Sequence, residues 1–519
     1  MNQMNQKLMP QKSYTLNYLN IYFWQFISIV LNLISMFVVI PRLASNPSIY
    51  GIYIVCISAN IFLTYADIGF AGAGYKYASE SFAQKNLEEE IKIVGFVGFV
   101  LLLFVIIFAL TVSGIAFNLS ILIKNINSAA EVNVASNLLL ILALFSPAII
   151  FQRILDIVYG IRLEQFILQR IMIAASLLKI LSIFYFFKNH SYDIVGYYLF
   201  CQLVYMLALF ICLLIANIKY KYNFIVFFRS IRFSKQMFLK TRNLAFGSLF
   251  STIMFILYYE LDAFAIAKLF GLENVAIYAI GFTILSFLRS LFGVLYAPFL
   301  ARFNHFIALN DIDGLRKLYR NVLILTLPFV IFPIVSLALL MEPLIHSWVG
   351  NFYEKSVIIA QLLILGFLGG FISYPASFLI IAQEKIKILY FASAISAVVY
   401  WTGIVLTIPY LGLTSFALLK FITLSINSVV YLIITLNFME ILAGEFVRKI
   451  LGPVAIPLSF LILSLIYLNK IMPAEKNALD LFIVIATGGL ASAGALFLYY
   501  LFSSPFRDYT QGLFRKCFA

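Results

Sequence analysis

The chain has 519 residues, of which 63% are hydrophobic and only 11% are charged. Soluble domains carry about 25% charged residues, so this composition excludes an ordinary soluble protein and indicates an integral membrane protein. The formal net charge of +14 would suggest nucleic-acid binding in a soluble chain. In a membrane protein it fits basic cytoplasmic loops, and we expect no nucleic-acid partner.

Apolar stretches long enough to cross a bilayer recur along the whole chain. A helix needs about 20 apolar residues to span a hydrocarbon core of roughly 30 Å. The alternating pattern of barrel strands is missing from the sequence, so we expect helices. Hydropathy predicts about 14 spans, near residues 19–41, 47–71, 93–117, 135–158, 167–188, 193–216, 243–268, 274–299, 321–342, 355–381, 388–408, 412–438, 450–470 and 478–502.

A basic segment after the sixth span suggests the domain organisation. Residues 217–242 alternate basic side chains with aromatic and aliphatic ones, which suits a tether in the headgroup layer or an ordinary cytoplasmic loop. We predict an all-α polytopic membrane protein with two pseudo-symmetric six-helix lobes and two C-terminal helices. The predicted parts are the N-terminal lobe 1–216, the linker 217–242, the C-terminal lobe 243–440, and the last two spans with a tail, 441–519.

The distribution of basic residues predicts the orientation. With the N-terminus in the cytoplasm, the cytoplasmic segments hold about 26 Lys and Arg and the outer segments about 7, so we expect both termini inside. The polar N-terminal residues precede a full-length span, which is not the pattern of a cleaved signal peptide.

Cysteine and histidine are too few and too scattered for a metal centre. The four cysteines, Cys56, Cys201, Cys212 and Cys517, have the spacing of neither a disulfide framework nor a zinc site. The three histidines, His190, His305 and His346, lie far apart in the sequence. We therefore expect no metal ion and no cofactor.

Ionisable residues within the spans are the candidate site residues. Such a residue near the bilayer centre costs roughly 2.5–3.5 kcal/mol on insertion scales and usually faces a cavity or a partner. With a helical period of 3.6, each of them except Glu260 shares a helix face with polar or aromatic side chains. The candidates are Arg42, Lys179, Glu260, Asp262, Arg289 and Lys420.

Asp262 and Glu260 fall on different faces of the predicted span 243–268. Asp262 shares a face with Tyr258 and Tyr259, whereas Glu260 lies about 200° round the helix among apolar residues. Asp262 is therefore the better cavity candidate. Glu260 needs a partner on a neighbouring helix, or is protonated.

Two interpretations of these charges stay open. They could form buried ion pairs, such as Asp262 with Lys179 or Lys420, or snorkel towards water. Alternatively they line one cavity with an excess of positive charge. Such a cavity suits an anionic substrate, because the arginine fork clamps phosphate oxygens and lysine offers a point charge.

Several motifs occur in an order that resembles a known family. Tyr50-Gly-Ile-Tyr opens the second span and Asp67-Ile-Gly-Phe closes it. Asp262-Ala-Phe-Ala-Ile-Ala-Lys-Leu-Phe-Gly precedes Val275-Ala-Ile-Tyr. Later motifs are Asn310-Asp-Ile-Asp-Gly, Ile381-Ala-Gln-Glu-Lys and Tyr410-Leu-Gly-Leu-Thr. Over roughly residues 15–440 the chain resembles the Wzx-type O-antigen flippases of the multidrug/oligosaccharidyl-lipid/polysaccharide (MOP) exporter superfamily. It departs from them at Thr414 and Lys420, where we expect smaller or apolar residues.

The resemblance implies a transporter and not an enzyme. It implies export of an undecaprenyl-diphosphate-linked oligosaccharide, such as an O-antigen or capsule repeat unit, across the bacterial inner membrane by alternating access. Coupling to H⁺ or Na⁺ and cooperation with membrane lipids, a polysaccharide polymerase and glycosyltransferases would follow. It also places Arg42, Asp262 and Arg289 on cavity-lining helices. In this interpretation Arg289, Lys179 and Lys420 hold the pyrophosphate, and Asp262 with Glu260 carries the coupling cation or balances the charge.

Two other functions remain as alternatives. A cation-coupled drug exporter of the same superfamily should have about 12 spans and an anionic cavity. A polysaccharide polymerase or glycosyltransferase needs a large outer loop with groups placed for chemistry. The longest predicted outer loop, near residues 118–134, holds one Lys and one Glu.

Overall fold

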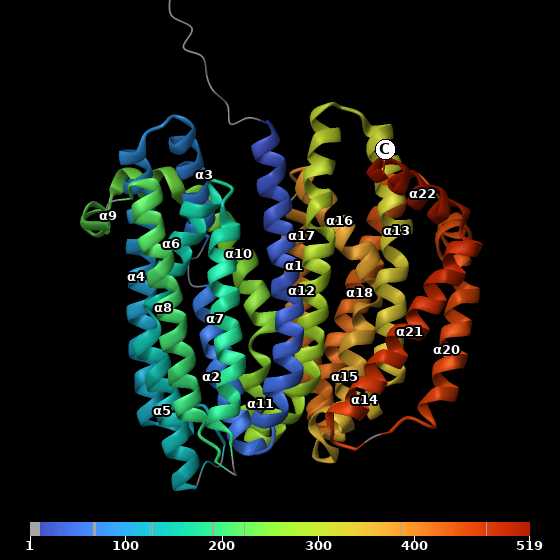
Figure 1. The fold of residues 1–519 in the computed structure, drawn as a ribbon, viewed down its shortest axis with the longest axis horizontal. Coiled ribbons are helices and arrows are strands. Elements are labelled where there is room, and N and C mark those ends of the chain that lie inside the picture. The colour runs from blue at the N-terminus through green and yellow to red at the C-terminus, as the bar shows by residue number, and fades with distance from the viewer. Residues whose placement is uncertain are drawn as a thin grey trace, which may run out of the picture. The chain divides into compact units, whose positions relative to one another are not determined.

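The structure is a computed structural model that describes residues 11–65, 69–124, 126, 128–188, 191–222, 224–385, 387–473 and 475–518. Within these ranges every regular element is a helix, which confirms the predicted all-α polytopic fold (Figure 1). Two residues of the predicted motif at the end of the second span, Asp67 and Ile68, and also His190, lie outside the described residues.

Contacts divide the chain into two compact units, Met1–Val275 and Ala276–Ala519. This division does not test the predicted domain boundaries, which stay predictions. In the first unit, apolar side chains of α2, α4, α5, α6 and α8 share one core. Its helices are α1 (Gln11–Leu43), α2 (Pro47–Tyr65), α3 (Phe70–Ala83), α4 (Leu87–Phe117), α5 (Ala129–Phe145), α6 (Ala148–Gly160), α7 (Gln165–Phe186), α8 (Ile194–Tyr220), α9 (Phe224–Ser230), α10 (Lys235–Tyr259) and α11 (Asp262–Phe270).

The second unit is built around long helices that pack in sequence-neighbouring pairs, such as α17 on α18 and α20 on α21. Helix α12 (Leu272–Ala308) starts at the unit boundary and continues into this unit. The other helices are α13 (Ile312–Leu339), α14 (Met341–Val349), α15 (Lys355–Leu365), α16 (Gly370–Ala382), α17 (Lys387–Leu411), α18 (Thr414–Met439), α19 (Ala443–Phe446), α20 (Ala455–Asn469), α21 (Ala478–Phe502) and α22 (Ser504–Phe518).

Among the described residues, twelve helices or helix pairs are long and apolar enough to cross a membrane. The pair α5–α6, bent by 42°, makes a thirteenth. The bend falls at Ser146 and Pro147, because proline has no N–H to continue the helical ladder. The chain is therefore a multi-pass membrane protein, and the prediction of about 14 spans agrees approximately with it.

The predicted span 243–268 is wrong as one continuous helix. Helix α10 ends at Tyr259, the Glu260 N–H closes its last turn on the Ile256 carbonyl at 2.9 Å, and α11 begins at Asp262. An aspartate in the first turn of a helix is favoured, because free N–H groups and the helix dipole attract a negative charge there. The sequence Glu-Leu-Asp therefore ends one helix and starts the next, and the face assignment made for a continuous helix no longer applies.

The short helices α11 and α14 share one design. Each has nine residues, an acidic residue in its first turn (Asp262 or Glu342), and a glycine directly after its last residue. Gly271 has φ 85° and ψ 178°, and Gly350 has φ 97° and ψ 170°. Glycine alone adopts this region readily, so both helices end at a residue that permits a sharp turn into the next helix.

Helix α9 in the basic segment packs closely on α4. A Cβ added at Gly95 would lie 2.0 Å from Ser230 Oγ, so only a glycine lets the two backbones approach this far. The Ser230 hydroxyl donates to the Ile91 carbonyl at 3.2 Å. Phe227 is buried beneath the helix, whereas Ile225 and Phe228 are exposed. These exposed apolar side chains next to Arg229 suit a position in the headgroup layer.

Candidate functional site

Helix α6 carries Arg153, which contacts two protein groups and has one further N–H group without a hydrogen bond among the described residues. Arg153 Nη2 donates to the carbonyl oxygen of Thr64 near the end of α2, and Nη1 lies 3.9 Å from Asp156 Oδ2. The last carbonyls of a helix have no intrahelical partner, and Arg153 satisfies one of them. Among the described residues its Nε is buried without a hydrogen bond. The side chains of Arg153 and Asp156 are 28% and 40% exposed, so the pair is accessible to a ligand.

Lys179 joins the same region from α7. Its Nζ lies 5.1 Å from the centre of the Tyr205 ring on α8, and the Tyr205 hydroxyl donates to Gln152 Oε1 on α6. A cation over the face of an aromatic ring is attracted by about 0.5–2 kcal/mol. We call Gln152, Arg153, Asp156, Lys179 and Tyr205 the N-terminal polar cluster. It holds two cations and one carboxylate, so its formal charge is positive.

Arg42 lies at the C-terminal end of α1, in contact with α7. Its guanidinium carbon is 4.2 Å from the centre of the Phe184 ring, and Nη1 donates to the Val38 carbonyl at 2.8 Å. A positive charge in the last turn of a helix is favoured by the helix dipole. Arg42 therefore has a structural role at this helix end, and it packs on α7, the helix that carries Lys179.

Glu260 and Asp262 flank the break between α10 and α11. Both are buried, with 4% and 2% of their surface exposed. The C-terminal end of α11 is held in place by Lys268, which donates to the Ser120 carbonyl at 2.8 Å, and by Lys124, which donates to the Leu269 carbonyl at 3.0 Å. The two carboxyl groups therefore lie at a fixed helix junction rather than along one straight helix.

In the second unit, Lys420 is enclosed by aromatic rings. It is fully buried on α18, and its Nζ lies 5.0 Å from the centres of both the Phe282 and the Tyr400 rings. Phe282 belongs to α12 and Tyr400 to α17. The ammonium group thus lies in a box whose walls come from three helices, and cation–π attraction compensates part of its lost hydration.

Arg289 lies on α12, on the same side as Phe282. The two residues are two turns apart, a rise of about 10 Å. The face of α12 that carries Phe282, the neighbour of Lys420, therefore also carries Arg289. The Tyr374 hydroxyl of α16 donates to the Arg289 carbonyl at 3.2 Å, and the Tyr374 ring stacks on Tyr296 with centroids 5.3 Å apart. Arg289 is half-buried beside this aromatic stack. The second unit therefore brings two of the predicted cations to one helix face.

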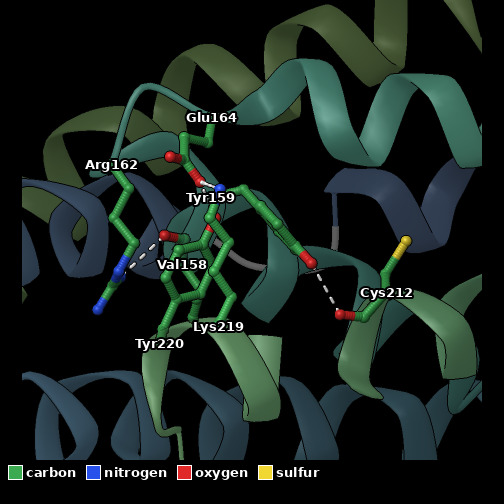
Figure 2. Close-up of polar contacts among 7 residues, drawn as sticks. All are labelled: Val158, Tyr159, Arg162, Glu164, Cys212, Lys219 and Tyr220. Atoms are coloured by element: carbon green, nitrogen blue, oxygen red, sulfur yellow. Dashed lines mark hydrogen bonds and ion pairs between the residues drawn. The ribbon is translucent and has the colours of Figure 1, made fainter. Parts of the chain in front are cut away.

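A further buried ion pair serves the fold. Arg162 Nη2 contacts both carboxylate oxygens of Glu90, at 2.8 and 3.1 Å, and its guanidinium carbon lies 4.8 Å from the Phe82 and Tyr220 rings. Figure 2 shows Arg162 donating to the Val158 carbonyl in the turn of α6. The pair is enclosed and neutral, so it offers little to a substrate.

The same close-up shows residues at the end of α6 next to residues of α8 (Figure 2). The Tyr159 hydroxyl donates to the Cys212 carbonyl at 2.8 Å, and Tyr220 and Lys219 both bond to Glu164. These contacts fix the end of α6 against the end of α8. We call Glu90, Arg162, Glu164, Lys219 and Tyr220 the helix-end network.

Within each unit, the structure brings some of the predicted residues together. In the first unit, Lys179 belongs to the N-terminal polar cluster, and Glu260 and Asp262 lie at the α10–α11 junction. In the second unit, Arg289 lies on α12, and Lys420 of α18 contacts Phe282 on the same face of α12. Arg42 packs on α7. The sequence analysis missed Gln152, Arg153 and Asp156, although the i, i+4 spacing of Gln152 and Asp156 places them on one face of α6.

Comparisons with known proteins identify the fold. The chain has the fold of MOP-superfamily membrane transporters, as structural comparison shows. The solved structure of a lipid II flippase, MurJ, in an inward closed conformation matches with a TM-score of 0.71. It is 17% identical, and the match covers 96% of this chain and 100% of that chain.

Two multidrug resistance MATE family transporters of the MOP superfamily also match. The inward-facing one has a TM-score of 0.63 at 12% identity, covering 79% of this chain and 94% of that chain. The outward-facing one has a TM-score of 0.53 at 12% identity, covering 81% and 95%. No protein-family model and no curated protein matches the sequence.

Proposed function

We propose that this protein is a flippase that moves an undecaprenyl-diphosphate-linked oligosaccharide, such as an O-antigen or capsule repeat unit, across the bacterial inner membrane by alternating access. The proposal rests on how much of this chain each solved structure of similar fold covers. A solved lipid flippase covers 96% of this chain, whereas the MATE transporters cover 79% and 81%. We propose further that both termini lie in the cytoplasm, which the distribution of Lys and Arg among the loops supports.

The membrane-embedded cations support an anionic substrate. In this proposal Arg289 binds the pyrophosphate through its fork, and Lys179 and Lys420 add positive charge. Arg153, with a buried Nε that has no partner among the described residues, is a further anion-binding group. Asp262, with Glu260, would carry the coupling H⁺ or Na⁺ or balance the cations.

A transport assay on purified protein tests the function directly. The full chain is reconstituted in vesicles that contain a fluorescent polyprenyl-diphosphate oligosaccharide, and a membrane-impermeant quencher reports how much label changes leaflet. We expect protein-dependent exchange, and a loss of at least about tenfold in Arg289→Ala, because a hydrogen bond to a charged group contributes about 1.5–3 kcal/mol. Arg302→Ala is the matched control, since Arg302 is exposed on the same helix.

The same variants are tested in the native cell. Arg289→Ala should abolish surface polysaccharide while the protein level stays unchanged. Full export by this variant would remove Arg289 from the proposed site. Absence of any protein-dependent exchange in vesicles, with well-folded protein, would remove the flippase itself.

A cation-coupled exporter of small molecules is the second candidate, favoured by the match to the MATE transporters. It predicts raised drug resistance on overexpression and no change in lipid-linked oligosaccharide. Accumulation of lipid-linked oligosaccharide in a deletion strain, without altered drug sensitivity, would decide for the flippase.

A further inference from the structure

A groove of about 420 Å³ runs between α17 and α18 in the second unit. Its walls are aliphatic and aromatic, and several of these side chains are exposed, Phe391 by 70%. The apolar wall is formed by Ile388, Phe391, Ile395, Val399, Ile426 and Val430. An apolar surface of this kind, at membrane depth, suits a hydrocarbon chain.

The polar side chains of the groove, apart from Lys387, already have hydrogen-bond partners within the protein. The Ser396 hydroxyl donates to Asn427 Oδ1 at 3.1 Å, and Asn427 Nδ2 donates back to Ser396 Oγ at 2.8 Å. Thr423 donates to the Leu419 carbonyl at 2.8 Å. Because these groups already have partners, an apolar ligand can bind in the groove without leaving them unsatisfied.

One end of the groove is basic. Lys387 lines it and is exposed, and Lys385 precedes it in the turn between α16 and α17, which also contains Glu384. From Lys387 to Val399 the helix rises by about 18 Å. One leaflet of a bilayer is about 15 Å deep, half of a core of roughly 30 Å. The groove is therefore about one leaflet long, with a cation where the headgroups lie.

We propose that this groove binds one anionic phospholipid, with an acyl chain between α17 and α18 and the phosphate at Lys387. A single acyl chain matches a groove of one leaflet's depth, whereas a long polyprenyl chain would extend well beyond Val399. The positive end selects an anionic headgroup over a zwitterionic one. This lipid site is independent of the proposed flippase function.

Native mass spectrometry of the full purified chain tests the site. The protein is titrated with phosphatidylglycerol and with phosphatidylcholine that has identical acyl chains. We expect one phosphatidylglycerol to be retained about fivefold more strongly than phosphatidylcholine, the factor that one cation near a headgroup supplies. Lys387→Gln should remove this preference, and Ala392→Trp, which fills the groove, should reduce retention of both lipids.

Leu406→Trp is the control, because Leu406 lies on α17, is 70% exposed and is not part of the groove. It should leave retention unchanged. Equal retention of the two lipids by the parent chain, or no effect of Ala392→Trp, would overturn the proposal. The parent chain could instead be a dimer that Ala392→Trp dissociates while lipid binding stays unchanged. That result would overturn the proposal and show that the groove binds a second copy of the chain. If Ala392→Trp does not yield monodisperse protein, Lys387→Gln decides, since that side chain is exposed.

Discussion

The ammonium nitrogen of Lys179 lies 5.1 Å from the centre of the Tyr205 ring, whose hydroxyl donates to Gln152. These contacts connect α7, α8 and α6 through polar groups inside the apolar spans. We expect Lys179→Met to keep the packing on Tyr205 but to remove the charge. Transport should fall at least about tenfold in the vesicle assay, since charged hydrogen bonds contribute about 1.5–3 kcal/mol. Lys188→Met, at an exposed position beyond the end of α7, is the control. Equal transport by both variants would contradict a role for Lys179.

Arg153 should matter for two reasons that can be separated. Arg153→Lys keeps the positive charge but loses the fork that reaches both Thr64 and Asp156. We expect the lysine variant to fold and to transport more slowly, and Arg153→Met to lose transport altogether. The measurement is substrate exchange in vesicles at equal amounts of monodisperse protein. Full exchange by Arg153→Met would show that the arginine only caps α2.

Breaking the pair of Arg162 and Glu90 should destabilise the protein. Both side chains are buried, and removing one partner of a buried pair costs about 3–5 kcal/mol because the other charge is left uncompensated. Arg162→Met and Glu90→Gln should each lower the thermal midpoint in detergent. The double variant should be more stable than Arg162→Met alone. A double variant that simply adds the two losses would argue against a paired role.

The two glycines that end the short helices should resist substitution. Gly271→Ala and Gly350→Ala force a side chain into a backbone region that costs about 1–3 kcal/mol. Thermal midpoints should fall in both variants. Gly293→Ala is the contrasting change: a Cβ there meets nothing within 4 Å, and alanine in a helix is favoured by about 0.5–1 kcal/mol. Stability should therefore rise slightly. Equal behaviour of the three variants would remove backbone strain as the cause.

Gly95 should be needed for the contact of α9 with α4. A Cβ at this position would lie 2.7 Å from the Ser230 carbonyl oxygen, so Gly95→Ala must displace α9. At Gly98 the nearest atom would be 3.5 Å away, an ordinary contact. We expect limited proteolysis to cut residues 219–234 faster in Gly95→Ala than in Gly98→Ala. Identical cleavage rates would show that α9 does not depend on this approach.

Hydropathy predicted most of the fold, because each span must be apolar along its whole length. The predicted ranges 355–381 and 478–502 agree with the structure within one or two residues. The range 243–268 failed because a window average cannot detect a break of two residues. The signal was present in the sequence: Asp262 suits a helix start, and Gly271 suits a helix end.

The candidate site was harder to predict than the fold. Lys179 and Lys420 stand out as charges in apolar stretches, but the aromatic rings around Lys420 come from residues 282 and 400, far away in the sequence. Nothing local predicts that contact. Arg153 was missed because it lies near the end of a predicted span, where basic residues are common. Pro147 inside a predicted span was a usable signal for the bend of 42° between α5 and α6.

The complete enclosure of Lys420 implies an order of events. In the proposed function, a phosphate group would meet the half-buried Arg289 before the fully buried Lys420, whose ammonium faces the Phe282 and Tyr400 rings. Contact with the lysine would then follow a side-chain movement, and its rate should depend on that movement rather than on diffusion of the ligand.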